Sequence, residues 1–246
     1  MRALRSPFFT SAPRALATAM AAAKPPLRGV VCDMDGTLVR STLDFTAMYA
    51  RCGVDKSQDI LAVIASWTDA AKRAAAHATI EEIERDALKT MELLHGAAEL
   101  GAWCAARGLP LGLVTRNTAA SVTWFHEKHW APLPPFAPAV SRDQGLPSKP
   151  HPAALLHCAE SWGVSAAHCA MVGDSPRDDV VAGRRAGFVT VLIAGASGRH
   201  GTGAAAAAAE HPERTPHAQV DGLHELPAAL EELFVVPAPL ASLGGG

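Results

Sequence analysis

The sequence predicts an α/β fold in which a mostly parallel sheet carries helices on both faces, with a small α-helical cap inserted into it. Short apolar runs that suit buried strands alternate with segments of helical periodicity, an order typical of parallel sheets. One long helical stretch, residues 41–94, interrupts this alternation after the first strand. At 246 residues and 49% hydrophobic content, the chain can bury a core of this size.

Each expected strand is a short apolar run bounded by charge or by turn residues. The first, residues 28–32, ends abruptly at Asp33, as buried parallel strands commonly do. The later strands are expected at residues 110–114, 139–140, 169–172, 188–193 and 219–220. Between and after them, helices are expected at residues 97–107, 119–128, 152–162, 180–186 and 227–233.

The inserted stretch has the pattern of a helical cap. Near its end, apolar residues recur at three- and four-residue steps: Ile80, Ile83, Ala87, Met91 and Leu94. Thr79 followed by Glu82 matches a capping box, which predicts that a helix begins there. Residues 28–40 and 95–235 are therefore assigned to the core and residues 41–94 to the cap.

The two ends of the chain differ in composition from the core. Residues 1–27 are rich in arginine, alanine and serine and contain no acidic residue. This composition resembles a transit peptide, which predicts an organellar protein of the chloroplast or mitochondrion. The alternative is a disordered leader on a cytoplasmic protein. Residues 201–209 form a low-complexity segment expected to be a loop, and residues 236–246 are expected to be a disordered tail.

Composition excludes several classes of partner. The net charge of -2 and a pI near 6.6 offer no overall basic field for nucleic acid or anionic lipid. No run approaches the roughly 20 apolar residues of a membrane-spanning helix, so a small molecule is the expected partner. The five cysteines are scattered without metal or redox spacing and are interpreted as reduced, mostly buried thiols: Cys32, Cys52, Cys104, Cys158 and Cys169.

Two carboxylates and a glycine follow the first strand, in the segment that begins at Asp33. Ligands of parallel α/β sheets bind beyond the carboxyl ends of the strands, so this is where catalytic residues are expected. Asp33 is ionised at neutral pH and needs no base to act as a nucleophile toward phosphorus. Asp35 suits the acid that protonates the leaving alkoxide and the base that later activates water. Gly36 allows a tight turn beside the ligand.

A carboxylate nucleophile and a phosphate dianion repel each other, which indicates a bound cation. Mg²⁺ prefers oxygen ligands and orients phosphoryl oxygens. Asp174, after the strand at residues 169–172, is the expected additional ligand. Asp178 and Asp179 follow it; Asp178 is the stronger candidate for a supporting role, and Asp179 is better explained as a charge favoured by the helix dipole.

Two further segments are expected to handle phosphate. Thr115, Arg116 and Asn117 follow the second strand, where a hydroxyl and the N–H groups of a helix start suit an anion. Arg116 either faces the substrate or pairs with a carboxylate. Lys149 supplies positive charge that can pair with Asp33 and stabilise the transferring phosphoryl group.

These four segments resemble the four motifs of the haloacid dehalogenase superfamily, over residues 28–233. They read D-x-D-G-T, T-R-N, S-K-P and G-D-S-x-x-D-D. The resemblance implies a Rossmann-like core and Mg²⁺-dependent hydrolysis of a small phosphorylated metabolite. It makes Asp33 the nucleophile and a metal ligand, Asp35 the acid/base with a metal-binding carbonyl, and Asp174 the third ligand. Thr115 and Lys149 become the phosphate-site pair.

The position of the cap is similar to that in phosphoglycolate phosphatases and β-phosphoglucomutases, and the short cap resembles plant and fungal hydrolases of this superfamily. A phosphomutase would use the same residues and remains an alternative, as does a non-catalytic module that binds phosphometabolites. A dehalogenase is disfavoured, because it needs neither Asp35 nor Asp174.

Overall fold

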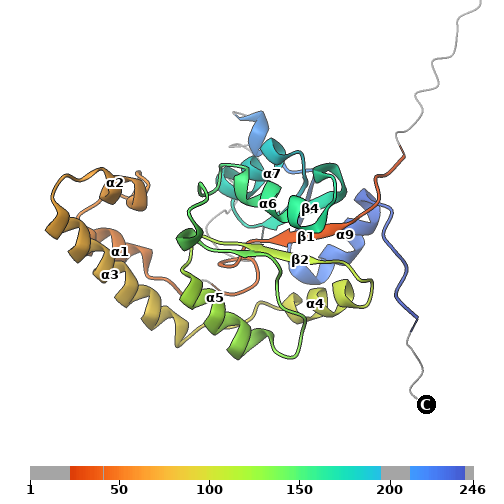
Figure 1. The fold of residues 1–246 in the computed structure, drawn as a ribbon, viewed down its shortest axis with the longest axis horizontal. Helices are drawn as coiled ribbons and strands as arrows, with labels where there is room; N and C mark the ends of the chain where they lie inside the picture. Colours follow the sequence, from red (N-terminus) through yellow and green to blue (C-terminus); the bar gives the residue numbers. More distant parts are fainter. Residues whose placement is uncertain (1–22, 41, 195–210, 242–246) are drawn as a thin grey trace, which may run out of the picture.

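Six parallel strands form the central sheet of the computed structural model, which describes residues 23–40, 42–194 and 211–241 (Figure 1). The strands are β1 (Gly29–Cys32), β2 (Leu111–Val114), β3 (Ala139–Val140), β4 (Cys169–Gly173), β5 (Val189–Ile193) and β6 (Ala218–Val220). Their order across the sheet is β3-β2-β1-β4-β5-β6. Every pair is parallel. The predicted α/β fold is confirmed.

The order of the strands creates a crevice at the centre of the sheet. Val31 of β1 lies opposite Gly112 of β2 on one side and Met171 of β4 on the other. From β1 the chain continues through β2 to β3 on one side of the sheet, and it then returns to β4 on the other side of β1. The loops that follow β1 and β4 therefore lead away from each other. Ligands of α/β sheets bind at such switch points.

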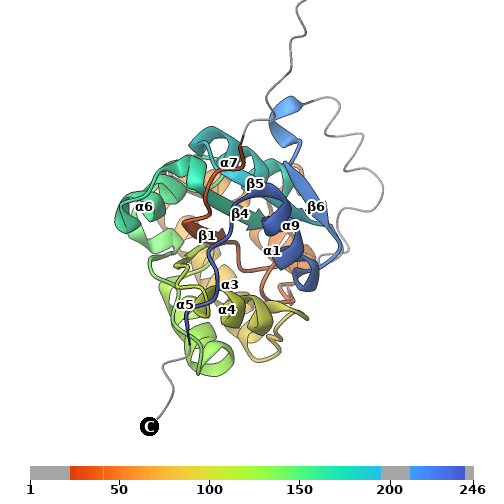
Figure 2. The same ribbon diagram turned by 90° about the vertical axis from the view of Figure 1, so that its right-hand side faces the viewer.

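Helices cover both faces of the sheet, as Figures 1 and 2 show. They are α4 (Ala97–Ala105), α5 (Ala119–Phe125) and α9 (Leu226–Leu233) on one face, and α6 (Ala153–Trp162) and α7 (Val181–Ala186) on the other. Side chains of a strand alternate between faces. Val30 and Cys32 accordingly join the hydrophobic cluster of the first face, and Val31 joins that of the second. Both sides of β1 are buried, which explains its continuous apolar sequence.

Short turns of helix connect these elements. The 3₁₀ turns are η2 (Arg142–Gln144), η3 (Ala166–His168), η5 (Pro212–Arg214) and η6 (Leu223–Glu225). The π-helical turns are η1 (His126–Trp130) and η4 (Pro176–Val180). Within the described residues, no helix is both long enough and apolar enough to cross a membrane.

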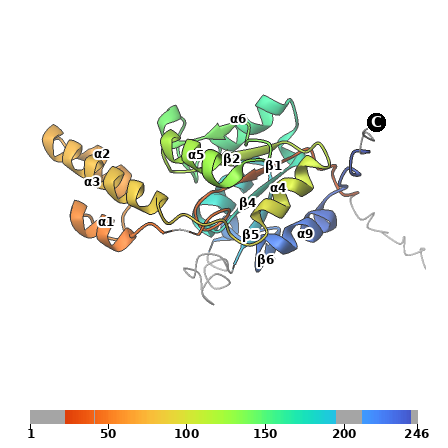
Figure 3. The ribbon, with the colours of Figure 1, turned by 90° about the horizontal axis from the view of Figure 1, so that it is seen from below.

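Three helices form the cap, which projects from one end of the core (Figure 3). They are α1 (Phe45–Cys52), α2 (Ile60–Ser66) and α3 (Ala70–Leu88). The cap has a hydrophobic cluster of its own, formed by Met48, Cys52, Val54, Ile60, Ile64, Ala76, Ile80 and Ile83. The helical nature of the insertion agrees with the sequence prediction.

Aspartates cap all three helices of the insertion. Asp44, Asp59 and Asp69 each accept a hydrogen bond from a backbone N–H three residues later, at 2.8, 3.0 and 3.0 Å. The predicted helix start at Thr79 is wrong, because Thr79 lies inside α3 and its hydroxyl donates to the Ala75 carbonyl at 3.0 Å. A threonine inside a helix satisfies its hydroxyl in this way, so the capping-box pattern was misleading.

The core begins earlier than predicted. Leu27 is fully buried in the main hydrophobic cluster, and the Lys24 ammonium donates to the Glu231 carbonyl at 3.0 Å. The last residues of the predicted leader therefore contact the core. Residues 1–22, which carry most of the predicted leader, lie outside the described residues.

The core also ends later than predicted. Val236 packs against the main hydrophobic cluster, and the Leu240 N–H donates to the Ala106 carbonyl at 2.6 Å. The first residues of the predicted tail therefore contact the core, while residues 242–246 and the low-complexity segment at 201–209 lie outside the described residues. All five cysteines are buried free thiols, as expected.

Candidate active site

Asp33 directly follows β1, and the chain then turns sharply through Asp35 and Gly36. The Asp33 N–H donates to the Val172 carbonyl at 2.9 Å, which extends the pairing with β4 by one residue. Gly36 has a φ of 81°, and a Cβ there would collide with Oδ2 of Asp174. Glycine is required for both reasons. The turn that carries Asp35 therefore packs directly against Asp174.

Lys149 lies at the centre of the site and is almost fully enclosed. Its Nζ is 2.5 Å from Oδ1 of Asp33 and 2.7 Å from Oδ1 of Asp179, and it donates to the Val114 carbonyl at 2.8 Å. Only 2% of its side chain is exposed. A buried ammonium is costly unless it is paired and hydrogen-bonded, and these oxygens meet that need. The Lys149–Asp33 pair expected from the sequence is present.

Three carboxylates converge beside this lysine. Asp33, Asp174 and Asp179 each offer an oxygen, and these oxygens all lie within 4.8 Å of one another. All three residues are buried. One ammonium faces three carboxylates, so the cluster carries excess negative charge in a region of low dielectric.

The pKa values reflect this crowding. Burial raises the pKa of Asp33 to about 6, an increase that Asp174 and Asp35 reinforce and Lys149 opposes. Burial likewise raises the pKa of Asp179 to about 7. Burial alone would lower the Lys149 pKa, but the carboxylates of Asp179 and Asp33 raise it well above its ordinary value. Lys149 is therefore a permanent cation in a site that still lacks sufficient positive charge.

The cluster fits a hard divalent cation. Its ligand atoms are all carboxylate oxygens, the type that Mg²⁺ prefers. Oδ1 of Asp179 is buried and, despite its ion pair with Lys149, accepts no hydrogen bond of normal geometry. Asp33, Asp174 and Asp179 are the residues that could hold the ion.

The structure reverses the expected ranking of Asp178 and Asp179. Asp179 is 2% exposed, contacts Lys149 and accepts a hydrogen bond from the Ser175 N–H at 2.9 Å. Asp178 is half-buried; its N–H donates to the Ser175 hydroxyl, which in turn contacts the Asp178 carboxylate at 3.1 Å. Asp179 is thus a member of the central cluster as well as an acidic residue in the first turn of η4.

Gly173 is the local signal that could have identified Asp179. A Cβ at Gly173 would collide with the Asp179 carboxyl group, so the strand ends in glycine where this side chain folds back against it. Asp178 also lines the cavity beside Asp174.

Thr115 and Asn117 occupy the loop after β2. The Thr115 N–H donates to the Val140 carbonyl at 2.9 Å, and its hydroxyl accepts from the Asn117 N–H at 3.1 Å. The Asn117 side-chain amide donates to the Asp35 carboxylate. Both residues line the cavity beside Asp33. Asn117, expected at the phosphate, thus makes its closest contact with the candidate acid/base.

Arg116 contacts the cap. Its guanidinium pairs with Asp59, the residue that caps α2. Of the two roles left open by the sequence, pairing with a carboxylate is the one observed, and burial of these groups is partial, with 35% and 43% of the side chains exposed.

The core and the cap together enclose one cavity of about 760 Å³. The predicted residues that line it are Asp33, Asp35, Thr115, Arg116, Asn117, Lys149, Asp174 and Asp178. The cap contributes an apolar wall that includes Phe45, Met48, Tyr49 and Ile80. A second cap–core ion pair, between Arg142 and Glu84, lines the cavity and was missed by the sequence analysis. Arg142 lies two positions after the end of β3, so the rule that site residues follow strands would have indicated it.

The chain is similar to known hydrolases over most of its length. A protein named haloacid dehalogenase-like hydrolase domain-containing protein, from Arabidopsis thaliana, is 34% identical over 223 residues, which cover 86% of this chain and 87% of that protein. An uncharacterized hydrolase of Saccharomyces cerevisiae is 37% identical over a match that covers 68% of this chain and 77% of that protein. A phosphoglycolate phosphatase of Nitrosococcus oceani is 29% identical over a match that covers 67% of this chain and 82% of that protein.

The fold is similar to solved structures as well. A hydrolase from Pseudomonas syringae superposes with a TM-score of 0.67 at 16% identity, covering 85% of this chain and all of that one. At this identity the likeness concerns the fold. The family described as haloacid dehalogenase-like hydrolases matches residues 27–187. The chain therefore belongs to the haloacid dehalogenase-like hydrolase family.

Proposed function

We propose that this hydrolase is a Mg²⁺-dependent phosphatase that acts on small phosphate monoesters through an aspartyl-phosphate at Asp33. The observation that carries the proposal is the junction of a carboxylate nucleophile, a buried lysine and two further buried carboxylates at the floor of one cavity. The relative named phosphoglycolate phosphatase supports the phosphate-ester class.

The first half-reaction forms the covalent intermediate. A carboxylate oxygen of Asp33 attacks phosphorus, the bond from phosphorus to the ester oxygen breaks, and Asp35 gives its proton to the departing alkoxide. Lys149 stabilises the negative charge on the phosphoryl oxygens. Mg²⁺, when bound by the carboxylates, supplies further neutralisation of that charge.

The second half-reaction returns the enzyme to its starting state. Asp35, now a carboxylate, takes a proton from water as the water oxygen attacks phosphorus. The bond between phosphorus and Asp33 breaks, and inorganic phosphate leaves. Asn117 donates to the Asp35 carboxylate and so holds it in place for both proton transfers.

Metal removal tests the proposal directly. Purified protein should hydrolyse 4-nitrophenyl phosphate in Mg²⁺, lose at least about 100-fold of its turnover in excess chelator, and recover when Mg²⁺ is restored. Acid-quenched enzyme in turnover should carry one phosphoryl group on the peptide that contains Asp33, detected by mass spectrometry. Hydrolysis that is insensitive to chelator, or a phosphoryl group elsewhere, would contradict the proposal. A panel of phosphorylated metabolites would then identify the substrate.

The neighbouring aspartates provide a matched pair of variants. We expect Asp179→Asn to lower kcat/KM by about 10- to 100-fold and to weaken the activation by Mg²⁺, because it removes a buried carboxylate of the central cluster. Asp178→Asn, which changes a half-buried residue outside the cluster of three carboxylates, should alter kcat/KM by no more than about threefold. Mg²⁺ titrations of 4-nitrophenyl phosphate hydrolysis compare the two. The reverse order of effects would return the functional role to Asp178.

A further inference from the structure

We propose that Glu84 of the cap and Arg142 of the core are positioning residues that hold Asp35 through Asn117. The inference rests on the proposed role of Asp35 as the acid/base. It assigns to the cap, beyond enclosing the substrate, a physical connection to the proton donor.

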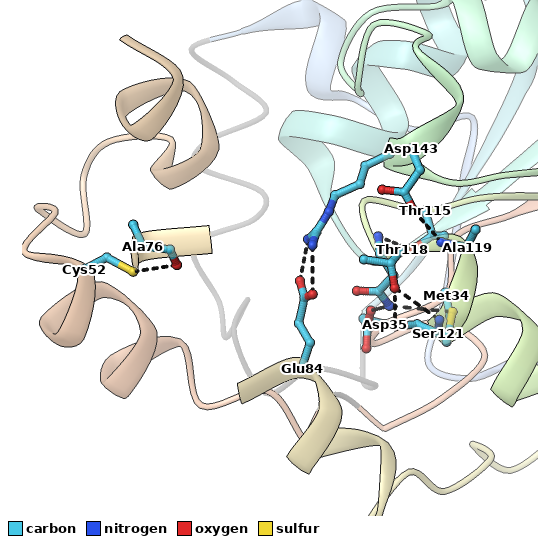
Figure 4. Close-up of polar contacts among 12 residues, drawn as sticks. Met34, Asp35, Cys52, Ala76, Glu84, Thr115, Thr118, Ala119, Ser121 and Asp143 are labelled. Atoms are coloured by element: carbon cyan, nitrogen blue, oxygen red, sulfur yellow. Dashed lines mark hydrogen bonds and ion pairs between the residues drawn. The ribbon is translucent and has the colours of Figure 1, made fainter. Parts of the chain in front are cut away.

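The first link is a buried ion pair between the cap and the core. Both guanidinium Nη atoms of Arg142 donate to the two carboxylate oxygens of Glu84, one of them at 2.9 Å. Only 9% of the Glu84 side chain and 17% of the Arg142 side chain are exposed. Figure 4 shows Glu84 pointing from α3 toward the core. A bidentate pair restricts both partners in distance and in orientation, so the position of α3 constrains Arg142.

The second link joins Arg142 to the loop after β2. The backbone N–H of Arg142 donates to the backbone carbonyl of Asn117 at 3.0 Å. The next residue, Asp143, accepts a hydrogen bond from the Ala119 N–H at 2.6 Å (Figure 4). The turn η2 therefore holds both ends of the three-residue stretch that starts at Asn117.

The third link joins Asn117 to Asp35. Asn117 is buried, with 8% exposed, and its backbone N–H is held by the Thr115 hydroxyl. Its side-chain amide donates to the Asp35 carboxylate and contacts the Met34 sulfur at 3.6 Å. Because the Asn117 backbone is fixed by η2, the direction of this amide depends on Arg142. Three successive contacts thus connect Glu84 to the candidate acid/base.

The other cap–core ion pair supplies a control. Arg116 and Asp59 also join the cap to the core, but their side chains are more exposed, and Asp59 pairs with Arg116 rather than with Arg142. Asp59→Asn keeps an oxygen that can cap α2 while removing the charge. It weakens the attachment of the cap without breaking the route through Arg142.

The experiment compares two substrates that differ in their need for a proton. Phenolate is a strongly basic leaving group and requires the general acid, whereas 4-nitrophenolate is weakly basic and leaves without it. We expect Glu84→Gln to lower kcat/KM for phenyl phosphate about tenfold more than for 4-nitrophenyl phosphate, since a displaced acid is penalised only when it is needed. Asp35→Asn should show the same bias more strongly. Asp59→Asn should affect both substrates equally.

Each result supports or overturns the assignment. Equal losses for both substrates in Glu84→Gln, together with a clear bias in Asp35→Asn, would overturn the positioning role and leave the proposed function intact. No bias in Asp35→Asn would instead overturn the acid/base role, and the inference with it. Circular dichroism and thermal melting establish folding. If Glu84→Gln is unfolded, the paired replacement Glu84→Leu with Arg142→Leu leaves no buried unpaired charge and should show the same bias.

Discussion

Asp33→Asn is expected to abolish turnover, with a loss on the order of 10⁴-fold or more in kcat, because an amide oxygen cannot form the covalent phosphoryl intermediate. The change keeps the shape of the side chain and removes one of three crowded negative charges from the buried cluster. We therefore expect the variant to fold and to keep or raise its melting temperature in metal-free buffer. Steady-state hydrolysis of 4-nitrophenyl phosphate and thermal melting measure the two effects.

Asp221→Asn serves as the control for this variant, since Asp221 is exposed and lies in the connection after β6. Its activity should match that of the parent protein. If Asp33→Asn retained the parent activity while folded, the nucleophile would have to be assigned to another residue.

Lys149→Met is expected to reduce kcat by about 10³-fold, the scale associated with losing a cation that stabilises a transferring phosphoryl group. Methionine fills a similar volume but leaves Asp33 and Asp179 without their common partner. Repulsion between the carboxylates should then lower the melting temperature in metal-free buffer. Added Mg²⁺ should raise the melting temperature more in this variant than in the parent, because the ion would replace the missing positive charge.

Lys128→Met is the matched control. Lys128 is exposed, its Nζ lies 5.4 Å from the ring centroid of Trp124, and it is not among the residues that line the cavity. Its loss should leave hydrolysis within about twofold of the parent. A Lys149→Met protein that kept more than about a tenth of the parent activity would show that positive charge at this position is dispensable.

The principal site residues could be predicted because they obey a topological rule. Asp33, Thr115 and Asp174 each follow an apolar strand, and parallel strands bring their carboxyl ends to one edge. Lys149 was placed by its position in the series of motifs, and the structure brings its Nζ to 2.5 Å from Asp33 across 116 positions of sequence. Local sequence patterns were sufficient to predict a site residue wherever the end of a strand determined its position.

The choice between Asp178 and Asp179 depended on packing. Both follow the same strand, and both suit the first turn of a helix. The turn η4 is π-helical, and the space left by Gly173 admits the Asp179 carboxyl group. Neither feature follows from charge or periodicity, so the sequence pattern did not identify Asp179 as a member of the buried cluster.

Contacts between the cap and the core were also beyond the sequence. Glu84 was not singled out by the sequence, and its 58-residue separation from Arg142 gave no local signal. The same holds for Arg116, which has its partner in Asp59. Leu27 had been assigned to the leader because the amino-acid composition changes only gradually there. Its burial depends on contacts with the far end of the chain, which the sequence does not show.

By itself the sequence determined the α/β class, the helical insertion, and the candidate site residues Asp33, Lys149 and Asp174, because alternating apolar runs and polar strand ends are local properties. Only the tertiary structure decided that Asp179 joins the buried cluster, and that the cap reaches Asp35 through Glu84, Arg142 and Asn117. Those outcomes depend on distances between segments that are far apart in the chain. The distances are set when the sheet assembles and the cap packs against the core.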